Sequence, residues 1–325
     1  MMITGLDHVV VLLADIKAGA AAYELLLGRA PSWRSRSDGA ETVLFTLDNM
    51  TLELMAPAGA SPAADRIRSV IKIWGEGLAS ICFRVGDIAK MHRRLDRLAL
   101  KPDPIAEVES RDSDSGGTLS WKRTRAATDM TRGVRMFFLE LAQERPHSAA
   151  TAAASILALD HVVVSSQDPE RAAALYGARL GLDMALDRSH QEWGQLMFFR
   201  CGDLIVEVVR RPVAGADHAH DKLWGLSWRV ADIDATHARL VAAGIDVSEV
   251  RIGRKPGTRV LSVRNGTCGI HTLLLERTAR ASTRCFLPSR GGYEYCALHS
   301  QFASCVLHPT PLLIERPIWP KQSEL

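Results

Sequence analysis

Two histidines of this 325-residue chain stand in the same short string, at the start of two matching stretches. The string LDHVVV places His8 within Leu6–Val11 and His161 within Leu159–Val164, an offset of 153 residues. In each copy an ionisable side chain stands among apolar residues that are typical of a strand. Imidazole titrates near neutral pH and is a frequent metal ligand, so both histidines are candidate site residues.

Two glutamates stand within apolar runs further along the same stretches. Glu53 lies in MTLELM and Glu207 lies in LIVEVV. Both runs have the length and composition of strands. A carboxylate is costly to bury in such a strand unless it meets a cation or faces a polar cavity. We therefore expect these two carboxylates to belong to a site.

The elements that must position these side chains recur in a fixed order. Each half begins with the strand that contains the histidine and continues with a helix that ends at glycine, at Gly28 and Gly181. Two strand-like runs follow, and the order then restarts. FRVGDIAKMHRRL (Phe83–Leu95) matches WRVADIDATHARL (Trp228–Leu240). The repeats predict four units, each with a strand, a helix and then further strands, and the units pair to form two domains.

The predicted fold class is therefore α+β. The first domain is expected at residues 3–145, an Ala/Ser/Thr-rich linker at 146–157 and the second domain at 158–278. Residues 279–325 contain half of the cysteines and show neither strand alternation nor a helical stripe. We expect this tail to be a disordered appendage. Pro57–Pro62 is expected to be a loop.

Composition excludes several classes of protein. A hydrophobic fraction of 47% and a charged fraction of 24% are typical of a globular protein. The net charge of +3 and the lack of a basic run argue against a nucleic-acid partner, and no apolar stretch is long enough for a membrane span. A strand is expected within a few residues of Met1, which leaves no room for a signal peptide. A cytoplasmic protein is therefore expected.

The matching stretches resemble the vicinal oxygen chelate superfamily, the group of glyoxalases, bleomycin resistance proteins and ring-cleavage dioxygenases. DHVVV followed by a Tyr-containing helix that ends in Leu-Gly (Asp7–Gly28 and Asp160–Gly181) is similar to its opening module. The FRVxDI and WRVxDI junctions are similar to its second module. The resemblance covers about residues 3–278. It implies two tandem domains, each of two βαβββ modules that form a curled mixed sheet around a cavity.

The resemblance also implies a set of metal ligands. Metal-dependent members hold a divalent ion through His, Gln and Glu side chains, and the ion chelates two neighbouring oxygens of the substrate. One ligand comes from the first strand of each module and one from its last strand. This implies metal ligation by His8 and Glu53 in the first domain and by His161 and Glu207 in the second. The two glutamates are also the candidate catalytic residues.

The second module of each domain departs from this pattern. Its first-strand position falls on Ser80 in one domain and on Gly225 in the other. The candidate last-strand carboxylates, Glu140 and Glu276, lie at strand ends, where a solvated glutamate is equally natural. A ring-cleaving dioxygenase needs two histidines and one carboxylate around iron. That set is incomplete in both domains.

Two functions therefore remain open, and in both the expected partner is a small molecule. The first is a glyoxalase-like lyase, isomerase or dioxygenase that uses Fe, Mn, Ni or Zn on an α-keto or carboxylate substrate. The second is a metal-free binding protein of the bleomycin-resistance type. The retained His/Glu pairs favour the enzyme, to which we lean, whereas Ser80 and Gly225 favour the binding protein. One domain can also be a structural copy of the other. The oligomeric state stays open.

Two further kinds of residue were weighed as site residues. Arg84 and Arg229 recur in the first strands of the second modules, where an arginine either pairs with a carboxylate of the neighbouring module or clamps an anionic substrate. We favour the structural pairing. His271 stands where the first domain has Arg135, and we expect His271 to be structural.

Overall fold

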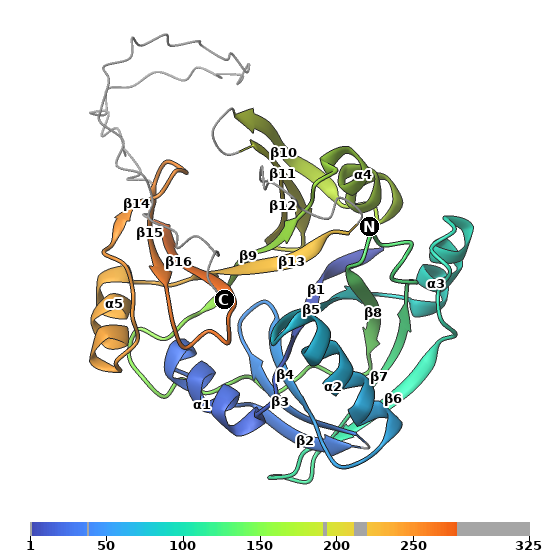
Figure 1. Cartoon of the computed structure of the whole chain (residues 1–325), viewed down its shortest axis with the longest axis horizontal. Helices are drawn as coiled ribbons and strands as arrows, with labels where there is room; N and C mark the ends of the chain where they lie inside the picture. The colour runs from blue at the N-terminus through green and yellow to red at the C-terminus, as the bar shows by residue number, and fades with distance from the viewer. Residues whose placement is uncertain (1, 38, 191–193, 211–219, 278–325) are drawn as a thin grey trace, which may run out of the picture. The chain divides into compact units, whose positions relative to one another are not determined.

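The computed structural model describes residues 2–37, 39–190, 194–210 and 220–277. Two eight-stranded mixed sheets make up this part of the chain, one from each half (Figure 1). This confirms the predicted α+β fold of two tandem domains. The expectation for residues 279–325 falls outside the described residues and stays a prediction.

The first domain contains eight strands and three helices. They are β1 (Ile3–Leu12), α1 (Ile16–Leu27), β2 (Trp33–Ser37), β3 (Ala40–Thr46), β4 (Thr51–Pro57), α2 (Pro62–Trp74), β5 (Gly77–Val85), α3 (Ile88–Arg97), β6 (Ala106–Arg111), β7 (Thr118–Arg125) and β8 (Arg135–Leu141). The strand order in the sheet is β2-β3-β4-β1-β5-β8-β7-β6. β1 is parallel to β4 and antiparallel to β5, so the two modules meet at the centre of the sheet.

The second domain repeats this topology. Its elements are β9 (Ala158–Ser165), α4 (Pro169–Ala173), a π-helical segment (Ala174–Arg179), β10 (Asp183–His190), β11 (Gly194–Cys201), β12 (Leu204–Val209), β13 (Lys222–Arg229), α5 (Ile233–Ala242), β14 (Arg251–Ile252), β15 (Thr258–Val263) and β16 (His271–Arg277). The strand order is β10-β11-β12-β9-β13-β16-β15-β14. Each strand therefore has a counterpart in the first sheet.

The repeated aspartates of the sequence begin the helices. Asp15 accepts hydrogen bonds from the backbone N–H groups of the first turn of α1, and Asp87 and Asp232 do the same for α3 and α5. These side chains satisfy donors that have no partner within the helix. α1 ends at Gly28, whose φ of 64° lies in the left-handed region that glycine adopts readily. The helix ends predicted from the sequence thus have local physical causes.

Alternation along the strands separates a core face from a concave face. On β1, Val9 and Val11 belong to the main hydrophobic cluster, whereas Val10 and Leu12 belong to a smaller cluster on the other face. The main cluster runs through both domains and includes residues of α1 and α5. His8 shares the face of Val10, because side chains two residues apart on a strand point the same way.

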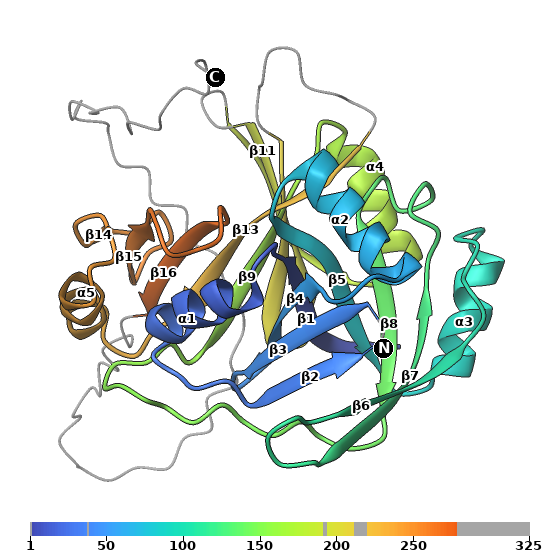
Figure 2. The ribbon, with the colours of Figure 1, turned by 60° about the horizontal axis from the view of Figure 1, so that its bottom comes forward.

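The two domains also meet through side chains that donate to helix carbonyl groups. Arg239 of α5 donates to the carbonyl oxygens of Leu25 and Leu26 in α1, at 2.6 and 2.9 Å. Arg94 of α3 donates to the carbonyl oxygen of Arg179 at the end of the π-helical segment. α1 and α5 lie side by side in both views (Figures 1 and 2).

Helix α2 was not predicted from the sequence. The predicted loop at Pro57–Pro62 ends where Ser61 caps the helix, and Pro62 occupies the first helical position, which lacks a partner for an N–H group anyway. Ile67, Val70 and Ile71 of α2 pack against the concave face of the first sheet. No described helix is long and apolar enough to cross a membrane.

Candidate functional site

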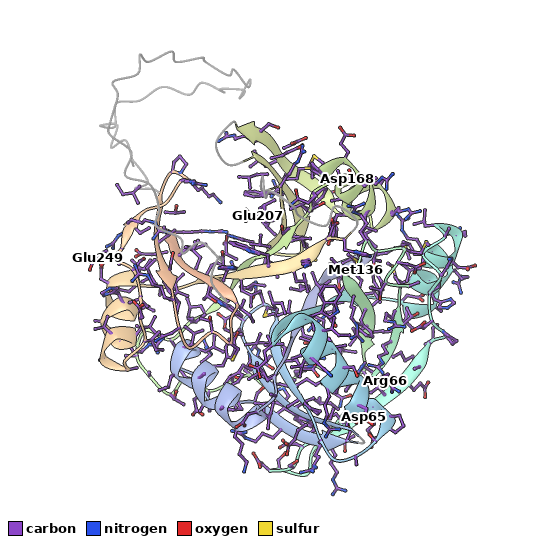
Figure 3. All side chains as sticks on the ribbon, viewed as in Figure 1. Asp65, Arg66, Met136, Asp168, Glu207 and Glu249 are labelled. Carbon is purple, nitrogen blue, oxygen red and sulfur yellow. The ribbon has the colours of Figure 1, made fainter. Side chains whose placement is uncertain are left out.

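The concave face of the first sheet and helix α2 enclose a cavity of about 1300 Å³. Side chains from alternate positions of β1, β4, β5, β7 and β8 line it. They include His8, Glu53, Ser80, Cys82, Arg123, Arg125, Arg135 and Phe137. Asp65 and Arg66 of α2 line it as well (Figure 3). The sequence-predicted residues His8 and Glu53 thus face one cavity.

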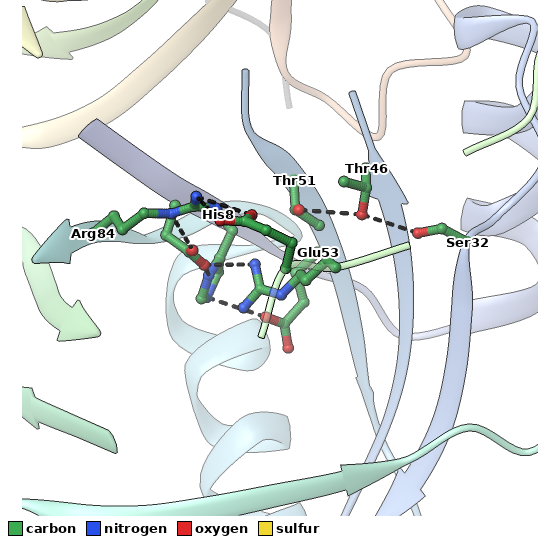
Figure 4. Close-up of polar contacts among 9 residues, drawn as sticks. His8, Ser32, Thr46, Thr51, Glu53 and Arg84 are labelled. Carbon is green, nitrogen blue, oxygen red and sulfur yellow. Dashed lines mark hydrogen bonds and ion pairs between the residues drawn. The ribbon is translucent and has the colours of Figure 1, made fainter. Parts of the chain in front are cut away.

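His8 and Glu53 come together at the wall of this cavity. The parallel pairing of β1 with β4 places Glu53 beside Val10, two residues from His8 on the same face. Nε2 of His8 lies 3.2 Å from Oε2 of Glu53 (Figure 4). The His8 side chain is 8% exposed and the Glu53 side chain 15%. The pair is therefore largely shielded from water while it still reaches the cavity.

Asp7 fixes the orientation of the His8 ring. Its Oδ1 lies 2.7 Å from Nδ1 of His8, and the Asp7 side chain is fully buried. Arg145 and Arg84 form ion pairs with it at 2.5 and 3.3 Å. Burial acts to raise the pKa of Asp7, but the hydrogen bond from His8 and the charges of Arg145 and Arg84 outweigh it and hold that pKa well below its usual range. An ionised carboxylate only accepts, so Nδ1 of His8 donates to Asp7, and Nε2 is turned toward Glu53.

The second domain repeats the arrangement. Nε2 of His161 lies 3.0 Å from Oε2 of Glu207 on β12, and Nδ1 lies 3.2 Å from Asp160. Arg277 forms an ion pair with Asp160, and Arg229 lies 3.9 Å from it. The predicted pairing of Arg84 and Arg229 with carboxylates of the neighbouring modules is therefore confirmed.

The strand register identifies the counterparts of His8 and Glu53 in the second module. His8 faces Cys82 across β1 and β5, and Val10 faces Ser80, so the local two-fold symmetry relates His8 to Ser80. β5 in turn pairs Cys82 with Phe137 on β8. Phe137 therefore stands where symmetry would place a second Glu53. An apolar ring takes the position of the fourth ligand.

The same register applies to the second domain. Val163 lies between Glu207 on one side and Gly225 on the other, and Ser227 pairs with Leu273. A Cβ atom at Gly225 would lie 2.8 Å from the carbonyl oxygen of His271, so no side chain fits there without a shift. The counterpart of the last-strand ligand is Leu273. The second modules thus lack both ligands in both domains.

Glu140 and Glu276 lie on the opposite face from the two pairs. Glu140 is three residues beyond Phe137, and an odd step along a strand reverses the face. Its Oε2 accepts a hydrogen bond of 2.6 Å from the backbone N–H of Ile88, at the start of α3. Oε2 of Glu276 accepts one of 3.2 Å from Ile233 at the start of α5. The structure therefore brings neither glutamate to a histidine, and both stabilise the positive ends of helices.

The donor atoms present fit part of a divalent metal site. Two ligand atoms that each lie about 2.1 Å from one ion, with their bonds at right angles, are roughly 3 Å apart. Nε2 of His8 and Oε2 of Glu53 are separated by a similar distance, 3.2 Å. The Asp7 carboxylate on Nδ1 is the usual support of a metal-bound imidazole. Within the described ranges, no group of three His, Cys, Asp or Glu residues is arranged so that all three could hold one metal ion. An ion held here would thus have two protein ligands and several positions open to water and substrate.

Sequence reasoning missed the arginines and the thiol of the cavity. Arg135 lies on β8 and Cys82 on β5, and both line the cavity. The sequence does not show which residues of these two strands lie side by side. Burial, followed by the Glu53 and Asp7 carboxylates, raises the pKa of Cys82 well above its ordinary value, so this thiol stays protonated. Arg123 acts in the opposite direction on the same thiol.

Comparison with known proteins identifies the family. Residues 6–158 match the glyoxalase-like domain, and residues 160–261 match the glyoxalase/bleomycin resistance protein/dioxygenase superfamily. The chain belongs to this superfamily and contains two of its domains in tandem. Its predicted membership of the vicinal oxygen chelate group is confirmed.

Individual relatives agree with this assignment. The chain is 37% identical over 99 residues to an ethylmalonyl-CoA/methylmalonyl-CoA epimerase of Cereibacter sphaeroides, a match that covers 29% of this chain and 70% of the epimerase. A mutant 4-hydroxymandelate synthase from Streptomyces coelicolor superposes with a TM-score of 0.64 at 15% identity, over 86% of this chain and 95% of the synthase. A Mn(II)-bound glyoxalase from Novosphingobium aromaticivorans gives 0.58 at 12% identity, over 86% and 83%. These two structures establish a shared fold.

Proposed function

We propose that the chain is a glyoxalase-like enzyme of the lyase or isomerase type, which acts on a small α-keto or carboxylate compound in the cavity of the first domain. His8 and Glu53 are its central residues and hold a divalent metal. The observation that carries the proposal is the approach of Nε2 of His8 to Oε2 of Glu53, 3.2 Å apart on the cavity wall.

A divalent metal, when bound, polarises a substrate carbonyl and stabilises an enolate by chelating two neighbouring oxygens. The residues of the chain supply orientation and proton transfer. Asp7 holds the His8 ring so that Nε2 faces Glu53. Glu53 presents the carboxylate that accepts a proton from a carbon next to the substrate carbonyl. Apolar side chains of α2 and β5 limit the access of water to this carboxylate.

The donor set favours isomerase or lyase chemistry over oxygen activation. Iron-dependent ring cleavage needs two histidines and one carboxylate at the metal. The first domain offers one histidine and one glutamate, and Ser80 and Phe137 take the other two positions. Of the three similar proteins described above, the epimerase has the highest sequence identity to this chain.

A metal-free binding protein of the bleomycin-resistance type is the second candidate. The observation that favours it is the apolar ring of Phe137 at the symmetry-related position of Glu53. In this case the cavity would take up a small molecule without turning it over.

Metal analysis of the untagged full-length chain tests the proposal. We expect Mn, Fe, Ni or Zn in the purified protein at a ratio that falls by about one ion per chain in the His8→Ala variant. Loss of one of two protein ligands removes most of the affinity of such a site. His92→Ala is the matched control, because His92 lies on α3 outside the cavity and its loss leaves the metal content unchanged.

The two candidates predict different results. The absence of bound divalent metal, together with no rise in melting temperature when any of these ions is added, would contradict the proposal of a metal-dependent enzyme. The binding-protein candidate would then stand. Equal metal loss in His8→Ala and His92→Ala would also contradict the assignment of the site.

A further inference from the structure

We propose that Arg135, supported by Arg123, forms an anion subsite that binds the carboxylate group of the substrate in the first-domain cavity. The location rests on the proposed function, but the subsite itself has a binding chemistry that does not depend on a metal. Both arginines line the same cavity as His8 and Glu53.

Among the described residues, Arg135 has no anionic partner for its charged side chain. It begins β8 on the concave face, and in the described part of the chain it forms no ion pair. Burial lowers the pKa of its guanidinium group, and the neighbouring charge of Arg125 lowers it further. A bound anion would stabilise the charge of this guanidinium group strongly, because it compensates both the loss of solvation and the repulsion from Arg125.

The neighbouring arginines differ from Arg135 in how they are held. Arg125 is bound by the Asp103 carboxylate, with Nε 3.0 Å from Oδ2. The guanidinium carbon of Arg123 lies over the ring of Phe137, 5.6 Å from its centroid, a contact that holds the guanidinium group without neutralising its charge. Arg135 and Arg123 therefore present free charge to the cavity. A guanidinium group binds a planar carboxylate through two parallel hydrogen bonds.

The strand register relates this subsite to the reacting end of the cavity. Glu53, Val10, Ser80 and Arg135 form one row across β4, β1, β5 and β8. Neighbouring strands are about 4.8 Å apart, so roughly 14 Å separates the two end residues at the backbone. Both end side chains are long and line one cavity, so the space between them suits a substrate of a few carbon atoms. Its carboxylate would lie on Arg135 and its reacting carbon near Glu53.

The second domain has a different residue at the same position. Gly225 pairs with His271, as Ser80 pairs with Arg135. The ring of His271 stacks on Trp224 with 4.1 Å between centroids. The row that begins at Glu207 therefore ends in an aromatic stack, and the anion subsite belongs to the first domain.

Calorimetric titration of the metal-free full-length chain with malonate tests the proposal. We expect Arg135→Met, which keeps an unbranched stem but removes the charged guanidinium group, to weaken malonate binding tenfold or more. Arg135→Lys should lose part of the affinity, because a lysine cannot form the paired contact. Lys122→Met is the matched control: Lys122 stands on β7 between Trp121 and Arg123 but outside the cavity, and should change the affinity less than twofold.

Several results would overturn the subsite. They are a wild-type chain that does not bind malonate, an Arg135→Met variant that binds it normally, and an equal loss in Lys122→Met. Binding of inorganic phosphate without malonate would contradict the carboxylate assignment. Mn²⁺ binding by the same variants separates this proposal from the proposed function, because Arg135→Met should retain the ion. His8→Ala should bind one ion fewer per chain and still bind malonate.

Discussion

At the scale of single residues, each candidate site contains a histidine between two carboxylates. One carboxylate orients the ring from the protein interior, and the other faces the ring at Nε2. Asp7 is buried, ionised and paired with arginines, whereas Glu53 reaches the cavity. The position of an ionisable histidine within the apolar strand LDHVVV was enough to predict His8 as a site residue. It could not reveal the arginine pair of Asp7, because Arg145 is 138 residues away in the sequence.

The Asp7→Asn variant tests the role of this buried carboxylate. At neutral pH we expect the free energy of unfolding to fall by about 3–5 kcal/mol, because Arg145 keeps a buried charge without its partner. The folded-state pKa of Asp7 is depressed, so its contribution is complete above about pH 4 and is lost as the pH falls further. Urea denaturation at several pH values measures the difference. A difference that stays constant down to acid pH would contradict this account.

At the scale of elements, strand register decides which side chains share the cavity. The sequence predicted most strands and their order, since both halves repeat the same pattern. Register could not be predicted, because β1 and β5 pair with irregularities that shift the partners by a residue. Such a shift moves a side chain to the other face of a sheet. Within β8, Glu140 lies three residues from Phe137 and so on the opposite face, whereas Arg135 lies two residues from Phe137 on the cavity face.

The Glu140→Gln variant tests the helix-capping role. Glu140 accepts a hydrogen bond from the first turn of α3, where a negative charge is favourable. We expect a loss of stability of about 1 kcal/mol in chemical denaturation and no change in metal content. The change removes the charge and keeps the shape, so it isolates the interaction with the helix. A loss of bound metal without a loss of stability would return Glu140 to the ligand set.

At the scale of the whole molecule, the two domains share one topology but differ in residues at corresponding positions. The tandem domains were predicted from the repeat, because Asp-His pairs, helix caps and the FRV and WRV junctions all recur. The two domains differ at residues that the shared fold does not require, such as Arg135 in the first domain and His271 in the second. We therefore expect the first domain to bind the anionic substrate, while the second retains a His161–Glu207 pair without the arginine.

The electron paramagnetic resonance spectrum of Mn²⁺ bound to the His161→Ala variant tests the central claim most directly. In this variant, the His8–Glu53 pair is the one of the two proposed metal sites that keeps its histidine. Oxalate offers two neighbouring oxygens, as the expected substrate does. The account predicts a signal of bound Mn²⁺ that changes on addition of oxalate and disappears in the His8→Ala/His161→Ala double variant. Free Mn²⁺ alone in the His161→Ala variant, or a bound signal that oxalate leaves unchanged, would contradict it.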